Sequence, residues 1–291
     1  MLNKRSLLLW VCFLIVFYGG MQAENETRIN LAASCHDCDY IPKVTNAGNI
    51  EIYNGVPVQI MHNGVRVLLG GYHGNWMSTI ISILKGHHEP QEEKVFYEVL
   101  KTIPNKATMI ELGSSWAYYS AWFNKAIVGA FNYMIEPHPE KLALGKKNFV
   151  LNDMVGTFYN AFIGSTTDRN AVFIDWDEKE FILPKICIDD FVMENKINFI
   201  HILHSDIQGA EYEMLLGAQK TMLDKKIGYI FISTHGNWHK QCYNFLKNFD
   251  FIIIAEHTPQ ESYSGDGLIV GRHSSYPGLN YIEISKNNVN G

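Results

Sequence analysis

The stretch MIELGSSWAYYS, residues 109–120, has the residue types found where a buried strand gives way to a ligand-binding loop and a helix. Its apolar lead-in ends on Glu111 and Gly113, and Ser115 offers a hydroxyl or an amide at the start of the helix. A dinucleotide-binding loop needs several glycines because its backbone must approach a pyrophosphate closely. A loop with one obligatory glycine suits a ligand that carries ribose and adenine without a pyrophosphate, and S-adenosylmethionine is such a ligand.

An acidic residue, Glu136, ends the next apolar run, FNYMIEP. In open α/β sheets an acid past the second strand accepts hydrogen bonds from ribose hydroxyls. We therefore expect Glu136 to bind the sugar of the same ligand.

Two further polar residues follow later apolar runs: Asp206 after NFIHILHS and His235 after FIST. Methyl transfer to an oxygen needs a group within hydrogen-bond reach that accepts the hydroxyl proton. We expect Asp206 to lie at the cofactor and to act as this base, with His235 as a second base or an orienting group. The alternatives are that Asp206 caps the helix that begins at Gly209 and that His235 is structural. His204, inside its run, is expected to be packed.

Three other clusters raise the question of a metal or another substrate. GHHEP, residues 86–90, has adjacent histidines, which rarely face one ion, and no further ligand is suitably spaced, so we expect no metal there. Cys35 and Cys38 form either half a zinc site or a small disulfide loop, and export would favour the disulfide. Asp175-Trp176-Asp177 matches the D-x-D pattern of many glycosyltransferases, which makes a membrane-anchored glycosyltransferase the rival enzyme hypothesis.

The elements that must position these residues alternate between short apolar runs and helical patterns, the signature of βαβ units and a parallel sheet. A helix begins at Pro90 before the first strand. The last two strands, FDFIIIAEH and GLIVGRH, lie too close for a helical crossover and should pair antiparallel. The predicted fold is an α/β, Rossmann-like class I methyltransferase, with a mostly parallel seven-stranded sheet, an antiparallel terminal hairpin and helices on both faces.

The whole chain is expected to divide into five parts. These are a signal peptide or signal anchor over residues 1–23, a linker or irregular segment over 24–55, an amino-terminal cap over 56–88, the methyltransferase domain over 89–275 and a tail over 276–291. Lys4 and Arg5 precede the apolar run LLLWVCFLIVFYGG, and Glu24 and Glu26 follow it. This pattern predicts a membrane-anchored or secreted protein that touches a membrane only through this segment. An apolar helix packed on the domain is the alternative. The net charge of -6 argues against a nucleic-acid partner.

From about residue 89 to 272 the chain resembles the FkbM-type family of S-adenosylmethionine-dependent methyltransferases. The residues that carry the resemblance are, in chain order, Glu89-Pro90, ELGSSWA (111–117), Glu136-Pro137, NFVLN (148–152) and SDIQGAE (205–211). The resemblance implies S-adenosylmethionine as cofactor, with its binding residues among Glu89, Glu111, Gly113, Ser115, Glu136 and Asp206.

Two positions depart from the family pattern. Ala117 stands in place of the last glycine of the loop, which is tolerable if its φ is negative where the helix begins. Gln208 stands in place of a glutamate, and because an amide carries no charge it can only form hydrogen bonds. We expect metal-free O-methylation of a hydroxylated small molecule, such as a sugar. A Rossmann-like binding protein without turnover is the alternative from another class.

Overall fold

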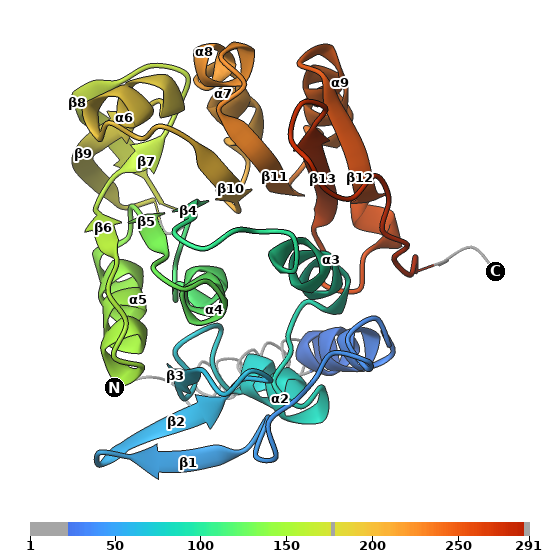
Figure 1. The fold of residues 1–291 in the computed structure, drawn as a ribbon. Helices are drawn as coiled ribbons and strands as arrows, with labels where there is room; N and C mark the ends of the chain where they lie inside the picture. Colours follow the sequence, from blue (N-terminus) through green and yellow to red (C-terminus); the bar gives the residue numbers. More distant parts are fainter. Residues whose placement is uncertain (1–22, 176–177, 288–291) are drawn as a thin grey trace, which may run out of the picture.

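The computed structural model describes residues 23–175 and 178–287 (Figure 1). The expected signal segment therefore falls, except for its last residue, outside the described residues. Within the described ranges no helix is both long and apolar enough to cross a membrane.

A seven-stranded sheet forms the centre of the molecule, with strand order β12-β13-β11-β10-β4-β5-β6. β4, β5, β6, β10 and β11 run parallel, β13 is antiparallel to both of its neighbours, and the predicted terminal hairpin is confirmed. The bounds are β4 Thr108–Leu112, β5 Phe131–Ile135, β6 Thr157–Tyr159, β10 Ile200–Ser205, β11 Ile227–Thr234, β12 Phe251–His257 and β13 Gly267–His273.

Helices cover both faces of this sheet (Figure 1). On one face lie α3 (Pro90–Leu100), α4 (Tyr118–Ala126) and α5 (Pro139–Leu151), and on the other α6 (Ile188–Glu194), α7 (Glu211–Leu216), α8 (Gln219–Leu223) and α9 (His239–Asn248). Successive strand residues point to opposite faces, so Met109 packs in one core and Ile110 in the other. Burial on both faces explains the continuous apolar runs of the sequence. The predicted fold class is confirmed.

Residues 23–88 form one layer beneath α3 and α4 (Figure 1). It contains a helix over residues 23–33, the antiparallel strands β1 (Ile50–Tyr53), β2 (Val56–Ile60) and β3 (Arg66–Leu68), and α2 (Asn75–Ile83). The stretch expected as a linker or irregular segment, 24–55, thus contains a helix and a strand, and β1 pairs with β2 across the boundary drawn at residue 56. Ala32 and Ile41 are buried, whereas Ile50 and Ile52 are exposed, so the apolar residues of this stretch follow no regular pattern in the sequence.

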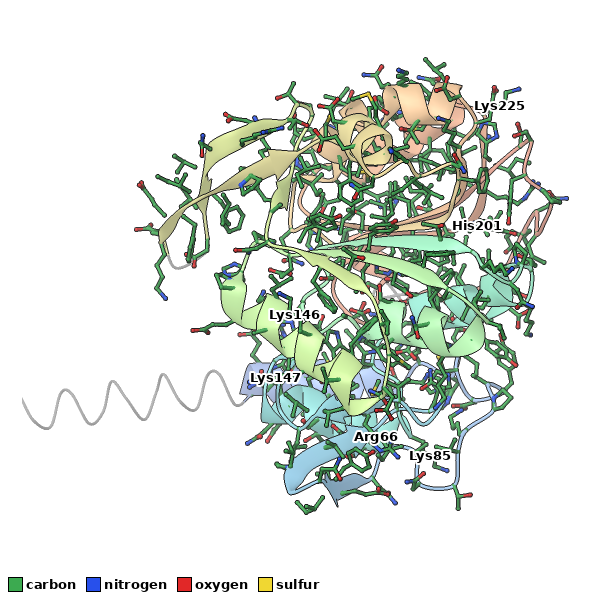
Figure 2. The ribbon with its side chains drawn as sticks, turned by 60° about the vertical axis from the view of Figure 1, so that its left-hand side comes forward. Arg66, Lys85, Lys146, Lys147, His201 and Lys225 are labelled. Atoms are coloured by element: carbon green, nitrogen blue, oxygen red, sulfur yellow. The ribbon has the colours of Figure 1, made fainter. Side chains whose placement is uncertain are left out.

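A second small sheet was missed by sequence reasoning. The apolar stretch GTFYNAFIG divides into β6 and β7 (Phe162–Ile163), and β7 joins the hairpin of β8 (Asp168–Ile174) and β9 (Glu180–Ile186). This hairpin extends away from the rest of the molecule (Figure 2), and its Val172, Ile174 and Ile182 are exposed. Asp175 lies in its turn, where Oδ1 accepts the backbone amide of Lys179. The other two residues of the D-x-D pattern lie outside the described residues.

Cys35 and Cys38 are both buried free thiols, so the disulfide that export would favour is not formed. Both belong to the layer of residues 23–88, and the Cys38 thiol donates to the carbonyl oxygen of Pro90 at 3.2 Å. This contact turns the Cys38 side chain toward the start of α3.

Candidate active site

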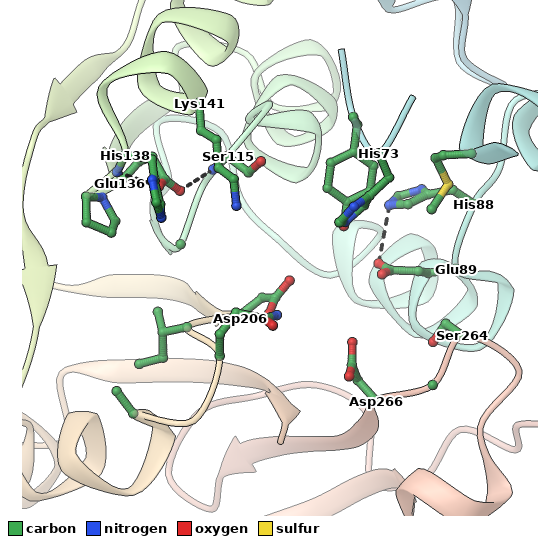
Figure 3. Close-up of a pocket in the computed structure, with 18 of the residues that line it drawn as sticks. His73, His88, Glu89, Ser115, Glu136, His138, Lys141, Asp206, Ser264 and Asp266 are labelled. Atoms are coloured by element: carbon green, nitrogen blue, oxygen red, sulfur yellow. Dashed lines mark hydrogen bonds and ion pairs between the residues drawn. The ribbon is translucent and has the colours of Figure 1, made fainter. Parts of the chain in front are cut away.

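A cavity of about 530 Å³ opens at the carboxyl ends of β4, β5 and β10 (Figure 3). This is where open α/β sheets bind ligands, and the volume is within the range of small-molecule sites. The cap layer closes its other side. Among the residues predicted from sequence, the cavity is lined by Glu89, Gly113, Ser115, Glu136 and Asp206, but not by Glu111 or His235.

The loop after β4 turns sharply under the cavity. Gly113, Ser115 and Ala117 have positive φ values of 70°, 43° and 57°. The expectation that Ala117 has a negative φ is wrong, because this residue lies before the first turn of α4 in the left-handed region. Left-handed geometry costs an L-residue about 1–2 kcal/mol, and the contacts around this fully buried residue must hold it there.

Glu136 lies between this loop and α5. Its Oε2 accepts the amide of Ser115 at 2.9 Å, and its Oε1 accepts the amide of His138 at 2.9 Å (Figure 3). Burial raises the pKa of Glu136. The carboxylate thus fixes the loop that carries Ser115 while facing the cavity, and its remaining lone pairs can accept hydroxyl donors.

Glu111 faces away from the cavity. Side chains alternate along β4, so Glu111 shares the face of Met109 and lies under α4, where it accepts the amide of Ser120 at 3.1 Å. Burial raises its pKa to about 7. Its role in this structure is to hold the first turn of α4, and the sequence alone could not distinguish this from contact with the ligand.

Asp206 follows β10 and projects into the cavity (Figure 3). Its Oδ1 accepts a hydrogen bond from the side-chain amide of Gln208 at 2.7 Å. Burial raises the pKa of Asp206 to about 7. The carboxylate of Asp266 also lines the cavity. A carboxylate with a pKa near neutrality can exchange a proton with a ligand at physiological pH.

His235 lies behind Asp206 and is surrounded by acids. Nδ1 contacts Glu211 Oε1 at 2.7 Å, and Nε2 lies 3.2 Å from Asp266 Oδ1 and 3.5 Å from Asp206 Oδ1. Burial opposes its cation, but the hydrogen bonds with Asp266 and Glu211 prevail and raise the pKa of His235 to about 10. Gln208 Nε2 also lies 2.8 Å from His235 Nε2, so polar groups hold the ring at both nitrogens. The protonated form of an imidazole accepts no proton.

Glu89 lies at the start of α3, opposite Asp206 (Figure 3). Its Oε2 accepts the hydroxyl of Tyr119 at 3.0 Å and lies 3.3 Å from His88 Nε2. Burial opposes the His88 cation, but Glu89 and Glu93 outweigh it and raise the pKa of His88 to about 10. An ion pair therefore forms one wall of the cavity. His204 is buried as expected, against Glu92.

Sequence reasoning missed the residues that the cap contributes to the cavity, among them Arg28, Tyr72, His73 and Trp76. The ring of Tyr72 stacks on Trp116 from the loop after β4, with centroids 4.5 Å apart and planes 2° from parallel. The aromatic residues in GYHGNW were the available signal, because aromatic residues are few in segments that remain unpacked.

The strand order and directions define a class I, Rossmann-like methyltransferase fold with its cavity at the expected edge of the sheet. The model of the methyltransferase FkbM domain matches residues 98–258, which is more than half of the chain. The chain therefore belongs to this family of methyltransferases, and its cofactor is S-adenosylmethionine.

Solved structures with a similar fold are distant in sequence. TrmK from M. capricolum, in complex with S-adenosyl-homocysteine, is 16% identical over 62% of this chain and 69% of that chain, with a TM-score of 0.43. The precorrin-6y C5,15-methyltransferase from Geobacter metallireducens is 13% identical over 62% and 88%, with a TM-score of 0.42. An rRNA methylase from Streptococcus thermophilus is 9% identical over 63% and 96%, with a TM-score of 0.43. Among curated proteins the chain has no match.

The residues around the cavity fit S-adenosylmethionine. Apolar side chains of Ile135, Ala161, Phe162 and Ile163 form one wall beside the Glu136 carboxylate, which suits an adenine next to a ribose diol. Ser115, Glu89 and Asp206 supply polar groups farther along the cavity. These residues would hold the cofactor.

Proposed function

We propose that this protein methylates a hydroxyl group of a sugar or a similar hydroxylated small molecule. The observation that carries the proposal is the Asp206 carboxylate, which lines the cavity at the end of β10 with a pKa of about 7. S-adenosylmethionine, when bound, supplies the electrophilic methyl group. Asp206 orients the acceptor hydroxyl and takes its proton as the oxygen forms its new bond to carbon.

The surroundings of Asp206 support this role. Gln208 donates to Oδ1 at 2.7 Å, which fixes the carboxylate without adding a charge. His235, held by Glu211 and Asp266, places a cation 3.5 Å from the same oxygen. This cation limits the rise in the pKa of Asp206 that burial causes, so the carboxylate stays available at neutral pH.

The opposite side of the cavity suits a hydroxylated ring. Tyr72 and Trp76 give it an aromatic wall, and Glu89 and Asp266 give it acceptors for hydroxyl groups. Pockets that combine apolar walls with a few placed polar groups select small ligands by shape and hydrogen bonding. The cap therefore provides the acceptor side of the site.

A screen with isotope-labelled S-adenosylmethionine tests the proposal. Purified protein is incubated with pools of glycosides, lipid-linked sugars, RNA and denatured protein, and labelled products are identified by mass spectrometry. We expect label on a carbohydrate oxygen and none with Asp206→Asn. Label on RNA or protein alone would refute the small-molecule acceptor.

The second candidate function is cofactor binding without turnover, which the amide of Gln208 in place of a family carboxylate favours. It predicts that S-adenosylhomocysteine binds to the folded protein while no pool becomes labelled. Gln208→Glu then tests it further, because a gain of methyl transfer in this variant alone would show that the wild-type site has lost its activity.

We also propose that the amino-terminal segment directs the domain out of the cytosol, on the charge pattern around its apolar run. Cell fractionation with protease protection of the full chain tests this. A chain found wholly in the cytosol would refute it without affecting the proposed chemistry.

A further inference from the structure

Cys38 and His87 of the cap layer (residues 23–88) come together with Glu93 of α3. Glu93 Oε1 lies 2.6 Å from Nδ1 of His88, which lines the active-site cavity, so the cluster lies next to that cavity. All three residues of the cluster are buried, and one coordinating atom from each lies within 4.8 Å of the other two. None of them lines the cavity. We propose that these three side chains bind one zinc ion, or a divalent transition metal of similar preference, as a structural site that joins the cap to the methyltransferase domain.

The donor set is the one that zinc takes in proteins. Thiolate, imidazole and carboxylate bind zinc at about 2.0–2.3 Å. Ligand atoms around such an ion are roughly 3–4 Å apart, so a group already within 4.8 Å closes on the metal with shifts of about 1 Å. Side-chain rotation is sufficient for movements of this size.

The unpaired ring nitrogen of His87 is the observation that points to a ligand in this cluster. The His87 side chain is 0% exposed, and Nε2 has no hydrogen-bond partner among the described residues. An unpaired buried polar atom destabilises the fold, because it has lost its hydrogen bonds to water without gaining a partner. Nδ1 contacts Glu93 Oε2. In the metal-bound form this contact is replaced, because the Glu93 oxygen and one ring nitrogen of His87 both turn to the ion.

Cys38 supplies the thiol, and the structure keeps it reduced. It is not paired with Cys35, and its weak hydrogen bond to the carbonyl of Pro90 is readily given up. On binding, the S–H bond breaks, the proton passes to solvent, and a sulfur–metal bond forms with no change of oxidation state. His36, Asp39 and Tyr40, on either side of Cys38 in the sequence, are exposed, so this segment of the chain lies at the surface while the Cys38 side chain is buried beneath it.

The site would connect parts of the chain that matter for the cavity. Cys38 precedes β1 in the cap, whereas Glu93 lies in the first turn of α3, four residues after Glu89. A structural zinc site contributes its binding energy directly to folding. Here that energy would hold the cap, which carries Tyr72 and Trp76, over the active site.

Metal titration of the full-length, tag-free protein tests the inference. The protein is reduced, treated with a chelator, dialysed, and titrated with Co²⁺, whose bond to a thiolate gives a charge-transfer absorption band in the near ultraviolet. We expect one equivalent of Co²⁺ per chain, displacement by Zn²⁺, and a rise in melting temperature. Wild-type protein without this band would overturn the proposal, whatever the variants do.

Single substitutions test which side chains bind the metal. Cys38→Ser should abolish the band, and His87→Gln should weaken binding by more than the about 10–100-fold that loss of an outer-shell partner costs. Cys35→Ser and Cys242→Ser, which remove other buried thiols, should leave the band unchanged. If Cys35→Ser abolishes the band and Cys38→Ser does not, the assignment is wrong. Circular dichroism establishes that each variant is folded.

Discussion

A methyl group on Gly113 would lie 1.8 Å from the backbone carbonyl oxygen of Asp206. The amide of Asp206 also donates to Leu112 at 3.0 Å, so the ends of β4 and β10 are in direct backbone contact. Gly113 is therefore required by the protein itself, before any ligand is considered. A larger side chain at this position, as in Gly113→Val, should therefore disrupt folding and not ligand binding alone.

We predict that Gly113→Ala destabilises the protein far more than Gly55→Ala. Both glycines have positive φ, 70° and 78°, but a Cβ on Gly55 would meet nothing within 4 Å. Gly55→Ala should cost about 1–2 kcal/mol from backbone strain alone, whereas the collision with Asp206 should bring the cost of Gly113→Ala above about 4 kcal/mol. Urea unfolding measures both, and equal costs would show that the loop adapts.

Glu136→Ala should weaken binding of S-adenosylhomocysteine by about 1.5–3 kcal/mol, the range for a hydrogen bond to a charged group. Part of the loss will come through Ser115 and His138, whose amides lose their acceptor. Glu140→Gln, an exposed position in the first turn of α5, is the control. Calorimetry measures both variants, and an affinity unchanged by Glu136→Ala would remove this residue from the site.

The rate of methyl transfer should rise with pH through about 7. Asp206 must be ionised to accept a proton, and its pKa is raised to about 7, so activity is low below this value and reaches a plateau above it. Asp206→Asn should lower kcat by about 10²–10⁴-fold and abolish this limb. A profile of kcat/KM against pH checks this, and retention of the limb in the variant would assign it to another group.

Glu111→Gln should become more stable relative to wild type as the pH rises. The pKa of Glu111 is raised from 4.5, the ordinary value for glutamate, to about 7 in the fold. The native state therefore holds the proton more tightly, and the stability of the wild-type protein falls as the pH rises between these two values. The shift corresponds to about 3 kcal/mol. Glutamine keeps an acceptor for the Ser120 amide. Urea unfolding at pH 5 and pH 8 measures the difference, and a gap that does not change with pH would contradict the assignment.

Residues at the carboxyl ends of strands were predicted best. Gly113, Ser115, Glu136 and Asp206 all line the cavity, because the carboxyl ends of parallel strands meet at one edge of a sheet. Glu111 lies within β4, one residue before its end, and its side chain points under α4 instead. His235 follows β11, yet the acids around it hold it behind the cavity wall.

The amino-acid sequence by itself determined the alternation of strands and helices in the central sheet, the antiparallel terminal hairpin and the family, because these depend on local apolar runs, turns and motif spacing. Only the tertiary structure decided that the cap supplies Tyr72 and Trp76 to the cavity and that Cys38 meets His87 and Glu93. It also decided the positive φ of Ala117. Each of these depends on contacts between segments far apart in the chain, and the packing energy that fixes such contacts leaves no periodic pattern in either segment alone.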